Sequence, residues 1–149
     1  MSAPADARPD GWVHSFPVVV QFDEVDQYGI VHHARYWIYC ERARVDLMGQ
    51  IGMRAENLDG EHLGLVVVDA KIKYRTPSRF LDELVVEQGC RRIGASRTVL
   101  CYIVRRGSTV VAEAEMVLAF VDGTGRPVRA PSILRDGLKR MGVPGDKKS

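Results

Sequence analysis

The chain has few cysteines, no long hydrophobic run and almost no net charge. Three cysteines in 149 residues, an odd number, argue against a disulfide framework and favour a reducing compartment. The longest apolar stretches, such as Leu63 to Val68, are far too short to cross a bilayer. The N-terminus lacks the basic-then-apolar pattern of a secretory signal. A net charge of +2 gives no reason to expect a nucleic-acid partner. These absences predict a cytoplasmic protein with neither a membrane nor a nucleic-acid partner.

Residues that bind metals are also sparse. The sequence contains no C-x-x-C and no H-x-x-x-H spacing. Its adjacent histidines, His32 and His33, would point about 100° apart on a helix and could not easily share a metal. We therefore expect no metal site. We interpret Cys40, Cys90 and Cys101 as small core residues, because each lies in an apolar context.

What remains is the pattern of a single globular domain. Apolar residues make up 46% of the chain and charged residues 27%, which is typical of a protein with an ordinary core. Residues 1–12, rich in Pro, Ala and Asp, and residues 142–149 are expected to be disordered tails. Residues 13–141 are then one domain.

A long helix and several strands are predicted within that domain. The helix runs from about Val31 to Gln50 and is apolar nearly all round in its first half. A short irregular or helical piece follows to about Gly64, and a second, short helix covers about Ser132 to Met141. The predicted strands are His14–Phe22, Val68–Arg75, Leu81–Arg91, Arg97–Arg105 and Thr109–Val121.

These elements predict an α+β fold in which a curved antiparallel sheet of about five strands wraps around the long central helix. Only a surrounding sheet would bury a helix of this composition. The sheet would leave an edge strand and part of the helix uncovered. We therefore expect a homodimer or homotetramer.

The most informative segment, Phe22 to Arg44, reads FDEVDQYGIVHHARYWIYCERAR. A carboxylate just ahead of a helix can act as a base or nucleophile, and the helix end offers N–H groups to a developing oxyanion. The segment resembles the signature of hotdog-fold acyl-CoA thioesterases of the 4-hydroxybenzoyl-CoA thioesterase type. It is most similar to their YbgC-like branch, with its D-x-D-x-x-G-V-V-Y-H-A-R-Y-like string. The T-P-S-R-F-x-D-E-L loop and the order of helix and strands match too, and the resemblance covers residues 16–131.

The resemblance implies an enzyme that hydrolyses an acyl thioester of coenzyme A or an acyl carrier protein to a free acid and a thiol. It places the catalytic carboxylate at Asp26, which attacks the thioester carbonyl as a nucleophile or activates water. It places the oxyanion donor at the amide of His33, with Gly29 permitting the turn that aims the loop. By spacing alone, Asp26 fits a simple turn or helix-start residue equally well.

Other residues of the segment have competing interpretations. For Glu24, two positions before the candidate carboxylate, we favour a solvated or salt-bridged structural role. A helix carboxylate is the nucleophile in another hotdog branch, but for Glu41 we favour an ion pair with Arg44, three residues later. His32 and Tyr28 depart from the family pattern, and substrate choice could depend on them.

Arg91 and Arg92 are candidate ligands for the phosphates of coenzyme A. The fork of a guanidinium suits phosphate, and the resemblance implies basic residues in this strand–turn region. A solvated polar face is the alternative. We expect no cofactor beyond the coenzyme A or phosphopantetheine of the substrate. Two further functions stay open: a polyketide-pathway thioesterase that releases a chain from a carrier protein, and a non-catalytic module that binds acyl thioesters.

Overall fold

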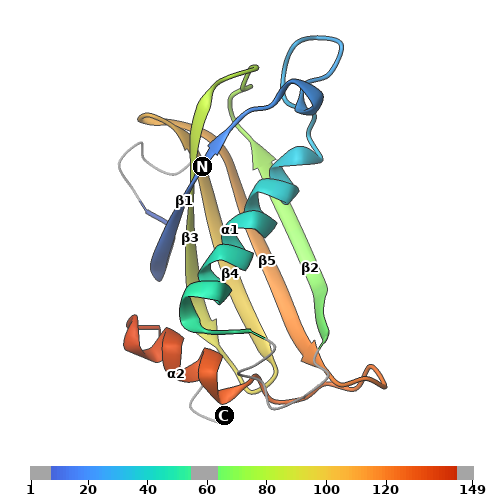
Figure 1. Cartoon of the computed structure of the whole chain (residues 1–149), viewed down its shortest axis with the longest axis vertical. Coiled ribbons are helices and arrows are strands. Elements are labelled where there is room, and N and C mark those ends of the chain that lie inside the picture. The colour runs from blue at the N-terminus through green and yellow to red at the C-terminus, as the bar shows by residue number, and fades with distance from the viewer. Residues whose placement is uncertain (1–7, 55–63, 144–149) are drawn as a thin grey trace.

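The computed structural model describes residues 8–54 and 64–143, which form one antiparallel sheet covered by helices (Figure 1). The sheet has five strands in the order β1-β3-β4-β5-β2. The strands are β1 (Trp12–Val19), β2 (Gly64–Tyr74), β3 (Glu83–Ile93), β4 (Arg97–Arg106) and β5 (Thr109–Val121). The helices are the short 3-10 helix η1 (Phe22–Glu24), α1 (Arg35–Ile51) and α2 (Ser132–Arg140). The predicted α+β hotdog architecture is confirmed.

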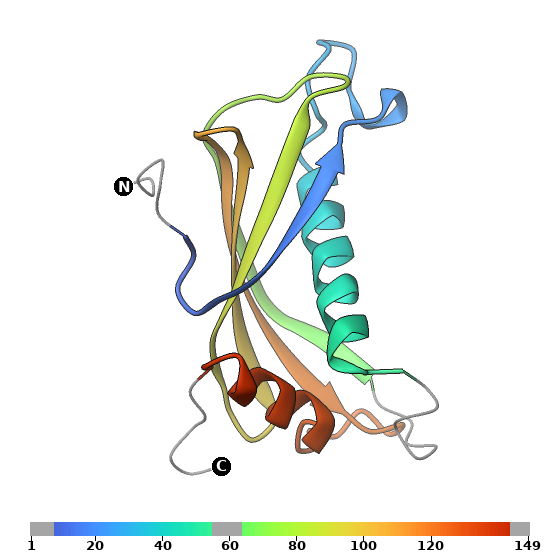
Figure 2. The same cartoon turned by 60° about the vertical axis from the view of Figure 1, so that its left-hand side comes forward.

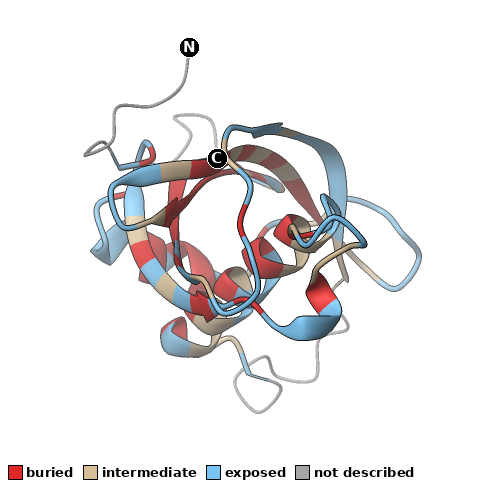
Figure 3. Ribbon diagram, turned by 90° about the horizontal axis from the view of Figure 1, so that it is seen from above, coloured by how far each residue is buried: buried red, intermediate tan, exposed pale blue. Residues whose placement is uncertain are grey.

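The long helix α1 lies inside the curve of the sheet (Figures 2 and 3). Its buried positions recur every three or four residues and so form one apolar face. They are Tyr36, Tyr39, Cys40, Ala43, Leu47 and Ile51. Among the described residues, α1 packs mainly against β1, β3 and α2. Every residue of β2 is exposed or half-exposed, so the β2 edge is the least covered side of the core.

The helix begins at Arg35, about four residues later than the sequence predicts. The residues before it pair with other backbone instead. The N–H of Val31 donates to Ser78 O (2.8 Å), and the N–H of His32 donates to Glu24 O (2.9 Å). Such bridging requires an extended backbone, so the helix starts only after these residues.

The second strand of the sequence also begins earlier than predicted. β2 starts at Gly64 rather than Val68, because its ladder with β5 continues across a register shift between Val67 and Asp69. A bulge breaks the alternation of inward and outward side chains, so the regular alternation that predicts a strand begins only at Val68. Most of the predicted piece that leads to Gly64 lies outside the described residues.

The core is filled by the inward faces of α1, β3, β4 and β5. Alternation along β5 predicts one inward face of Val110, Ala112, Ala114, Met116, Leu118 and Phe120; all of these are buried except Val110, which is half-buried. Cys40, Cys90 and Cys101 are buried, unpaired thiols, as expected of core residues. Burial raises the pKa of Cys40 to about 12, so this thiol stays protonated and unreactive.

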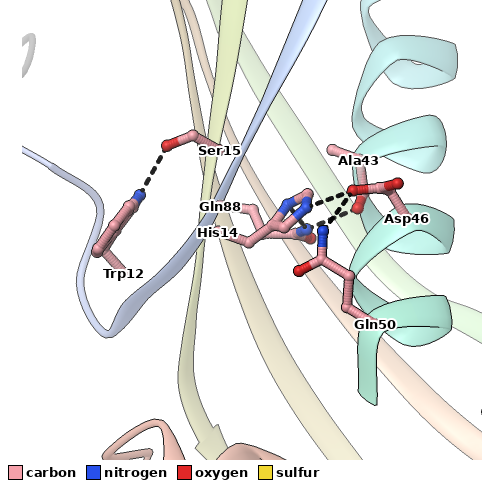
Figure 4. Close-up of polar contacts among 7 residues, drawn as sticks. All are labelled: Trp12, His14, Ser15, Ala43, Asp46, Gln50 and Gln88. Atoms are coloured by element: carbon pink, nitrogen blue, oxygen red, sulfur yellow. Dashed lines mark hydrogen bonds and ion pairs between the residues drawn. The ribbon is translucent and has the colours of Figure 1, made fainter. Parts of the chain in front are cut away.

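A buried polar cluster ties α1 to β1 and β3 (Figure 4). His14 Nε2 lies 2.7 Å from Asp46 Oδ2, and His14 Nδ1 lies 3.0 Å from Gln88 Nε2. Gln88 Nε2 also donates to Ala43 O (2.8 Å). Because an amide nitrogen only donates, Nδ1 accepts in this arrangement and the ring proton lies on Nε2, facing Asp46. These bonds fix the position of α1 over the sheet.

The two ends of the sheet carry different elements. The loop between β1 and α1 lies at the upper end in Figure 1, and α2 crosses the lower end. Arg135 Nη1 of α2 donates to Gly94 O (2.8 Å) in the β3–β4 turn. None of the helices in residues 8–54 and 64–143 is long and apolar enough to cross a membrane.

Candidate active site

The loop between β1 and α1 folds back on itself as a tight hairpin. Val25 and Val31 form an antiparallel bridge, and the N–H of Asp26 donates to Ile30 O (2.8 Å). The N–H of Gly29 donates to Asp26 O (2.9 Å), and Gly29 has a φ of +79°. This backbone region costs a residue with a side chain roughly 1 kcal/mol. Gly29 thus takes the turn conformation expected of it.

Asp26 has one carboxylate oxygen bonded and one open. Oδ1 accepts hydrogen bonds from the N–H of Tyr28 (2.8 Å) and, more weakly, from that of Ile30 (3.5 Å). This turn holds the carboxylate in one orientation. Within residues 8–54 and 64–143, Oδ2 has no hydrogen-bond partner. The half-buried side chain therefore keeps one oxygen available for a ligand.

A pocket of about 380 Å³ lies beside Asp26 at the start of α1 and is also lined by His33, Tyr36 and Tyr74. Tyr74 comes from β2, and its hydroxyl donates to His33 O (3.2 Å). The rings of Tyr36 and Tyr74 lie 5.8 Å apart. Burial raises the pKa of both tyrosines, so both hydroxyls remain donors near neutral pH. The pocket thus joins the loop, α1 and β2.

His33 stands just before α1 on the wall of this pocket. Its backbone N–H has no acceptor in the described part of the chain, whereas the amides on either side donate to Glu24 O and to His32 Nδ1. The rings of His32 and His33 stack with their centres 4.3 Å apart. An unbonded N–H at a helix start can stabilise an oxyanion. Asp26, Gly29 and His33 are therefore brought together.

The rival carboxylate Glu24 points away from the pocket and is buried beneath α1. Its Oε1 accepts from the N–H of Gln21 (2.8 Å) and the hydroxyl of Tyr39 (3.1 Å), and its Oε2 lies 3.7 Å from Arg42 Nη1. Glu24 is thus a salt-bridged structural residue, as favoured from the sequence.

The predicted ion pair between Glu41 and Arg44 is not formed. Glu41 is exposed and lines a groove beside β1, together with Phe16. Arg44 instead reaches between α1 and the sheet, where Nη1 lies 3.5 Å from Tyr102 Oη and 3.3 Å from Met116 Sδ. The apolar stem of Arg44 packs inward, whereas Glu41 stays at the surface, so the two side chains do not pair. Glu41 is also remote from the Asp26 pocket.

Comparison with known proteins decides the family. Residues 20–138 match the family model of the thioesterase-like superfamily. The chain belongs to this superfamily. The predicted family, and with it the predicted enzyme class of thioester hydrolases, is confirmed.

Individual relatives of this thioesterase-like chain agree. Acyl-CoA thioesterase YbgC of Haemophilus influenzae is 29% identical over 129 residues, which are 85% of this chain and 95% of that protein. The chloroplastic acyl-acyl carrier protein thioesterase ATL3 of Arabidopsis thaliana is 27% identical over 124 residues; the match covers 82% of this chain and spans 65% of that protein's length. The crystal structure of a probable thioesterase from Bartonella henselae has a TM-score of 0.74 at 26% identity, and covers 79% of this chain and 98% of that one.

The predicted phosphate ligands of this thioesterase-like chain, Arg91 and Arg92, lie far from Asp26 within one chain. They are near the end of β3 that meets α2, roughly 30 Å along the strand from the end beside Asp26. Arg91 already faces two carboxylates: its Nη2 lies 3.1 Å from Glu115 Oε2, and its Nε lies 3.6 Å from Asp10 Oδ2. Arg92 lines a surface pocket of about 420 Å³ together with Arg97, which leaves it better placed for an anion.

Sequence reasoning missed Tyr36 and Tyr74 as parts of the pocket. Tyr74 lies within the predicted strand Val68–Arg75, but local alternation does not tell which strand passes the start of the helix. Tyr36 was interpreted only as helix core. In the described parts of the chain, no three His, Cys, Asp or Glu side chains gather as a possible metal site.

Proposed function

We propose that the chain hydrolyses an acyl thioester of coenzyme A or of an acyl carrier protein to a free acid and a thiol. The observation that carries this proposal is that Asp26, with an open Oδ2, and His33, with an unbonded N–H, line one pocket. In the reaction, an oxygen bonds to the carbonyl carbon, and the carbonyl oxygen takes up negative charge opposite the His33 N–H. The carbon–sulfur bond then breaks, and the thiolate leaves and is protonated.

Asp26 has two possible roles that give the same products. As a nucleophile, it forms an anhydride with the acyl group, which water then hydrolyses. As a general base, it takes a proton from the water that attacks the carbonyl carbon. A thiolate is a good leaving group, so neither route needs a strong general acid. We propose that no metal or bound cofactor takes part.

Both kinds of thiol are supported by relatives. The Haemophilus protein is named for acyl-CoA and the Arabidopsis protein for acyl carrier protein. We propose that this chain acts in the cytoplasm, which fits its buried, unpaired cysteines. A non-catalytic module that binds acyl thioesters is the alternative, and it predicts that Asp26 is dispensable.

We further propose a homodimer, or a tetramer built from dimers, joined through β2. This strand is eleven residues long and lies at an edge of the sheet, with Val66, Val67 and Val68 between 44% and 54% exposed. A long apolar edge strand invites pairing with another strand. Two β2 edges paired antiparallel about a two-fold axis would bring the β3–β4 turn of the partner to the same end as Asp26. The phosphates of coenzyme A would then meet Arg92, with Arg91 beside it, across the dimer.

The experiment is an assay of free thiol release over aryl, short, medium and long acyl-CoA and acyl-phosphopantetheine substrates, with a metal chelator present. We expect turnover by the wild type and a large loss in Asp26→Asn, which should still bind substrate. Equal turnover by both proteins would remove Asp26 from the mechanism. No turnover by the wild type on any substrate would favour the binding module.

A further inference from the structure

Arg44 is a cation without a counter-charge in the interior of the fold. It is half-buried, and the partners of its Nη1 are the neutral Tyr102 Oη and Met116 Sδ. Within residues 8–54 and 64–143, no carboxylate lies within ion-pair distance of its guanidinium. Withdrawing an unpaired charge from water is costly, and such groups normally have an anion beside them. A bound anion would therefore stabilise Arg44, and none of the described carboxylates lies close enough to take this place.

The ionisable side chains next to Arg44 do not provide this anion. Burial raises the pKa of Cys40 to about 12 and raises that of Tyr102 well above its ordinary value, although the charge of Arg44 acts to lower both. Both groups are consequently neutral near pH 7. The positive charge remains available to a ligand.

Arg44 also lies where the tail of a bound acyl group would run. From Tyr74 in the catalytic pocket, the inward faces of β2 and β5 continue through the small side chains of Ala70 and Ala114. Ala70 is exposed and pairs with Met116, the contact of Arg44, so Arg44 lies over the same face of the sheet two register steps from Tyr74. A small apolar cavity of about 30 Å³ lies on the α2 side of Arg44, lined among others by Leu47, Leu65 and Leu134. It is too small to hold an acyl chain, so a tail that follows β2 and β5 from the pocket would end at the cation.

The length of that tail follows from the geometry of α1. Arg44 is eleven residues after His33, which is about 16 Å along the direction of α1 at 1.5 Å per residue. Helical side chains lean toward the N-terminus. The guanidinium is therefore roughly 12 Å from the His33 amide, a span that suits an acyl chain of medium length.

We propose that Arg44 binds a carboxylate at the far end of the acyl group, so that the preferred substrates are thioesters of medium-length dicarboxylic acids. This inference rests on the proposed thioesterase function and adds the substrate class to it. A charge-assisted bond between guanidinium and carboxylate supplies about a tenfold to hundredfold preference. A short diacid, such as succinate, would leave its carboxylate out of reach of Arg44.

The test compares suberyl-CoA with octanoyl-CoA, which differ only in having a carboxylate or a methyl group at the end of the chain. In the wild type, kcat/KM should favour suberyl-CoA by at least about tenfold. Arg44→Met should lose this preference, and Arg44→Lys should keep part of it. Arg42→Met, which removes an exposed arginine of the same helix, is the matched control and should retain the wild-type ratio. Succinyl-CoA should show no such advantage over butyryl-CoA. A wild-type ratio near or below one, or a ratio unchanged in Arg44→Met, overturns the inference.

Calorimetric binding of the same two ligands to the wild type and to Asp26→Asn separates this inference from the proposed function. Suppose that suberyl-CoA binds more tightly than octanoyl-CoA, that this difference depends on Arg44, and that the wild type turns over neither ligand. This result would contradict the proposed hydrolysis but support the Arg44 site. Turnover of both substrates by the wild type, without a preference for suberyl-CoA, would keep the proposed hydrolysis and remove the Arg44 site.

Arg44→Met should unfold at the same or a higher temperature, because an unpaired charge is removed. A lower unfolding temperature with both substrates equally impaired would make Arg44 a structural residue only.

Discussion

Three carboxylates within four residues have three different environments, and these environments assign their roles. Asp23 is exposed. Glu24 is buried and accepts hydrogen bonds from the Tyr39 hydroxyl and the backbone N–H of Gln21. Asp26 is half-buried, with one oxygen tied to the loop backbone and the other open at the pocket. Only the last combination fixes a carboxylate in place while leaving it free to react.

Buried thiols and phenols should make the protein sensitive to alkali. Ordinary pKa values are 9.0 for cysteine and 10.0 for tyrosine, and burial raises those of Cys40, Tyr39 and Tyr102. Below about pH 9 these groups are protonated whether the chain is folded or unfolded, so their contribution to stability is complete. At higher pH the unfolded chain loses protons that the folded chain keeps. Stability should therefore fall, by up to about 1.4 kcal/mol per pH unit for each group.

Urea unfolding at about pH 8 and about pH 10.5 measures this loss. Cys40→Ala, which removes one of these groups, should lose less stability than the wild type over the same interval. A wild-type free energy of unfolding that does not change between the two pH values would contradict the assignment.

The elements differ in how far they could be predicted. β5 was predicted with its observed bounds, because inward and outward side chains alternate from Ala112 to Leu118, although its pairing with β4 shifts register near Val111. The start of α1 was wrong, since bridges from Val31 and His32 to other segments override local helical preference. The predicted Glu41–Arg44 pair was wrong for a similar reason. Spacing along a helix shows which side chains are neighbours, but it does not show that one of them packs against the sheet instead. The Asp26 loop was found through a motif, whereas its pocket needed Tyr74 from a distant strand.

The loop before α1 and the end of α1 offer a matched test with two glycines. Gly29 has a φ of +79° and Gly49 is helical, and a Cβ at either position would meet no atom within 4 Å. Gly29→Ala should cost about 1 kcal/mol of stability from backbone strain and should lower turnover by moving Asp26. Gly49→Ala should add about 0.5–1 kcal/mol, because alanine favours the helix. Urea unfolding checks both values, and changes of the same sign would contradict this description of the loop.

For the whole molecule, the uneven cover of the sheet predicts how chains associate. Both β1 and β2 are edge strands, but only β2 has three consecutive valines exposed. Val67→Lys should reduce the mass in solution to that of a single chain, because charge on an edge opposes strand pairing. The matched control is Val19→Lys on β1, where the valine is 43% exposed compared with 54% for Val67. Sedimentation analysis distinguishes them, and an unchanged mass for Val67→Lys would rule out assembly through β2.

The proposed assembly would also link the two ends of the molecule. Within one chain the Asp26 loop and the arginines of the β3–β4 region lie at opposite ends of the sheet, so a coenzyme A thioester bound at Asp26 would reach such arginines only on the partner chain. Val67→Lys should therefore also raise KM for acyl-CoA.

The most direct test of the role of Asp26 is the rate of a single turnover with enzyme in excess over a bound acyl-CoA. Asp26→Asn and Asp23→Asn each remove one carboxylate from the same loop, and only the first lies on the pocket. We expect Asp26→Asn to be slower than the wild type by at least about a hundredfold, with substrate binding and the folded state retained. Asp23→Asn should react at close to the wild-type rate. Wild-type speed in Asp26→Asn, or equal losses in the two variants, would contradict the assignment of the chemistry to Asp26.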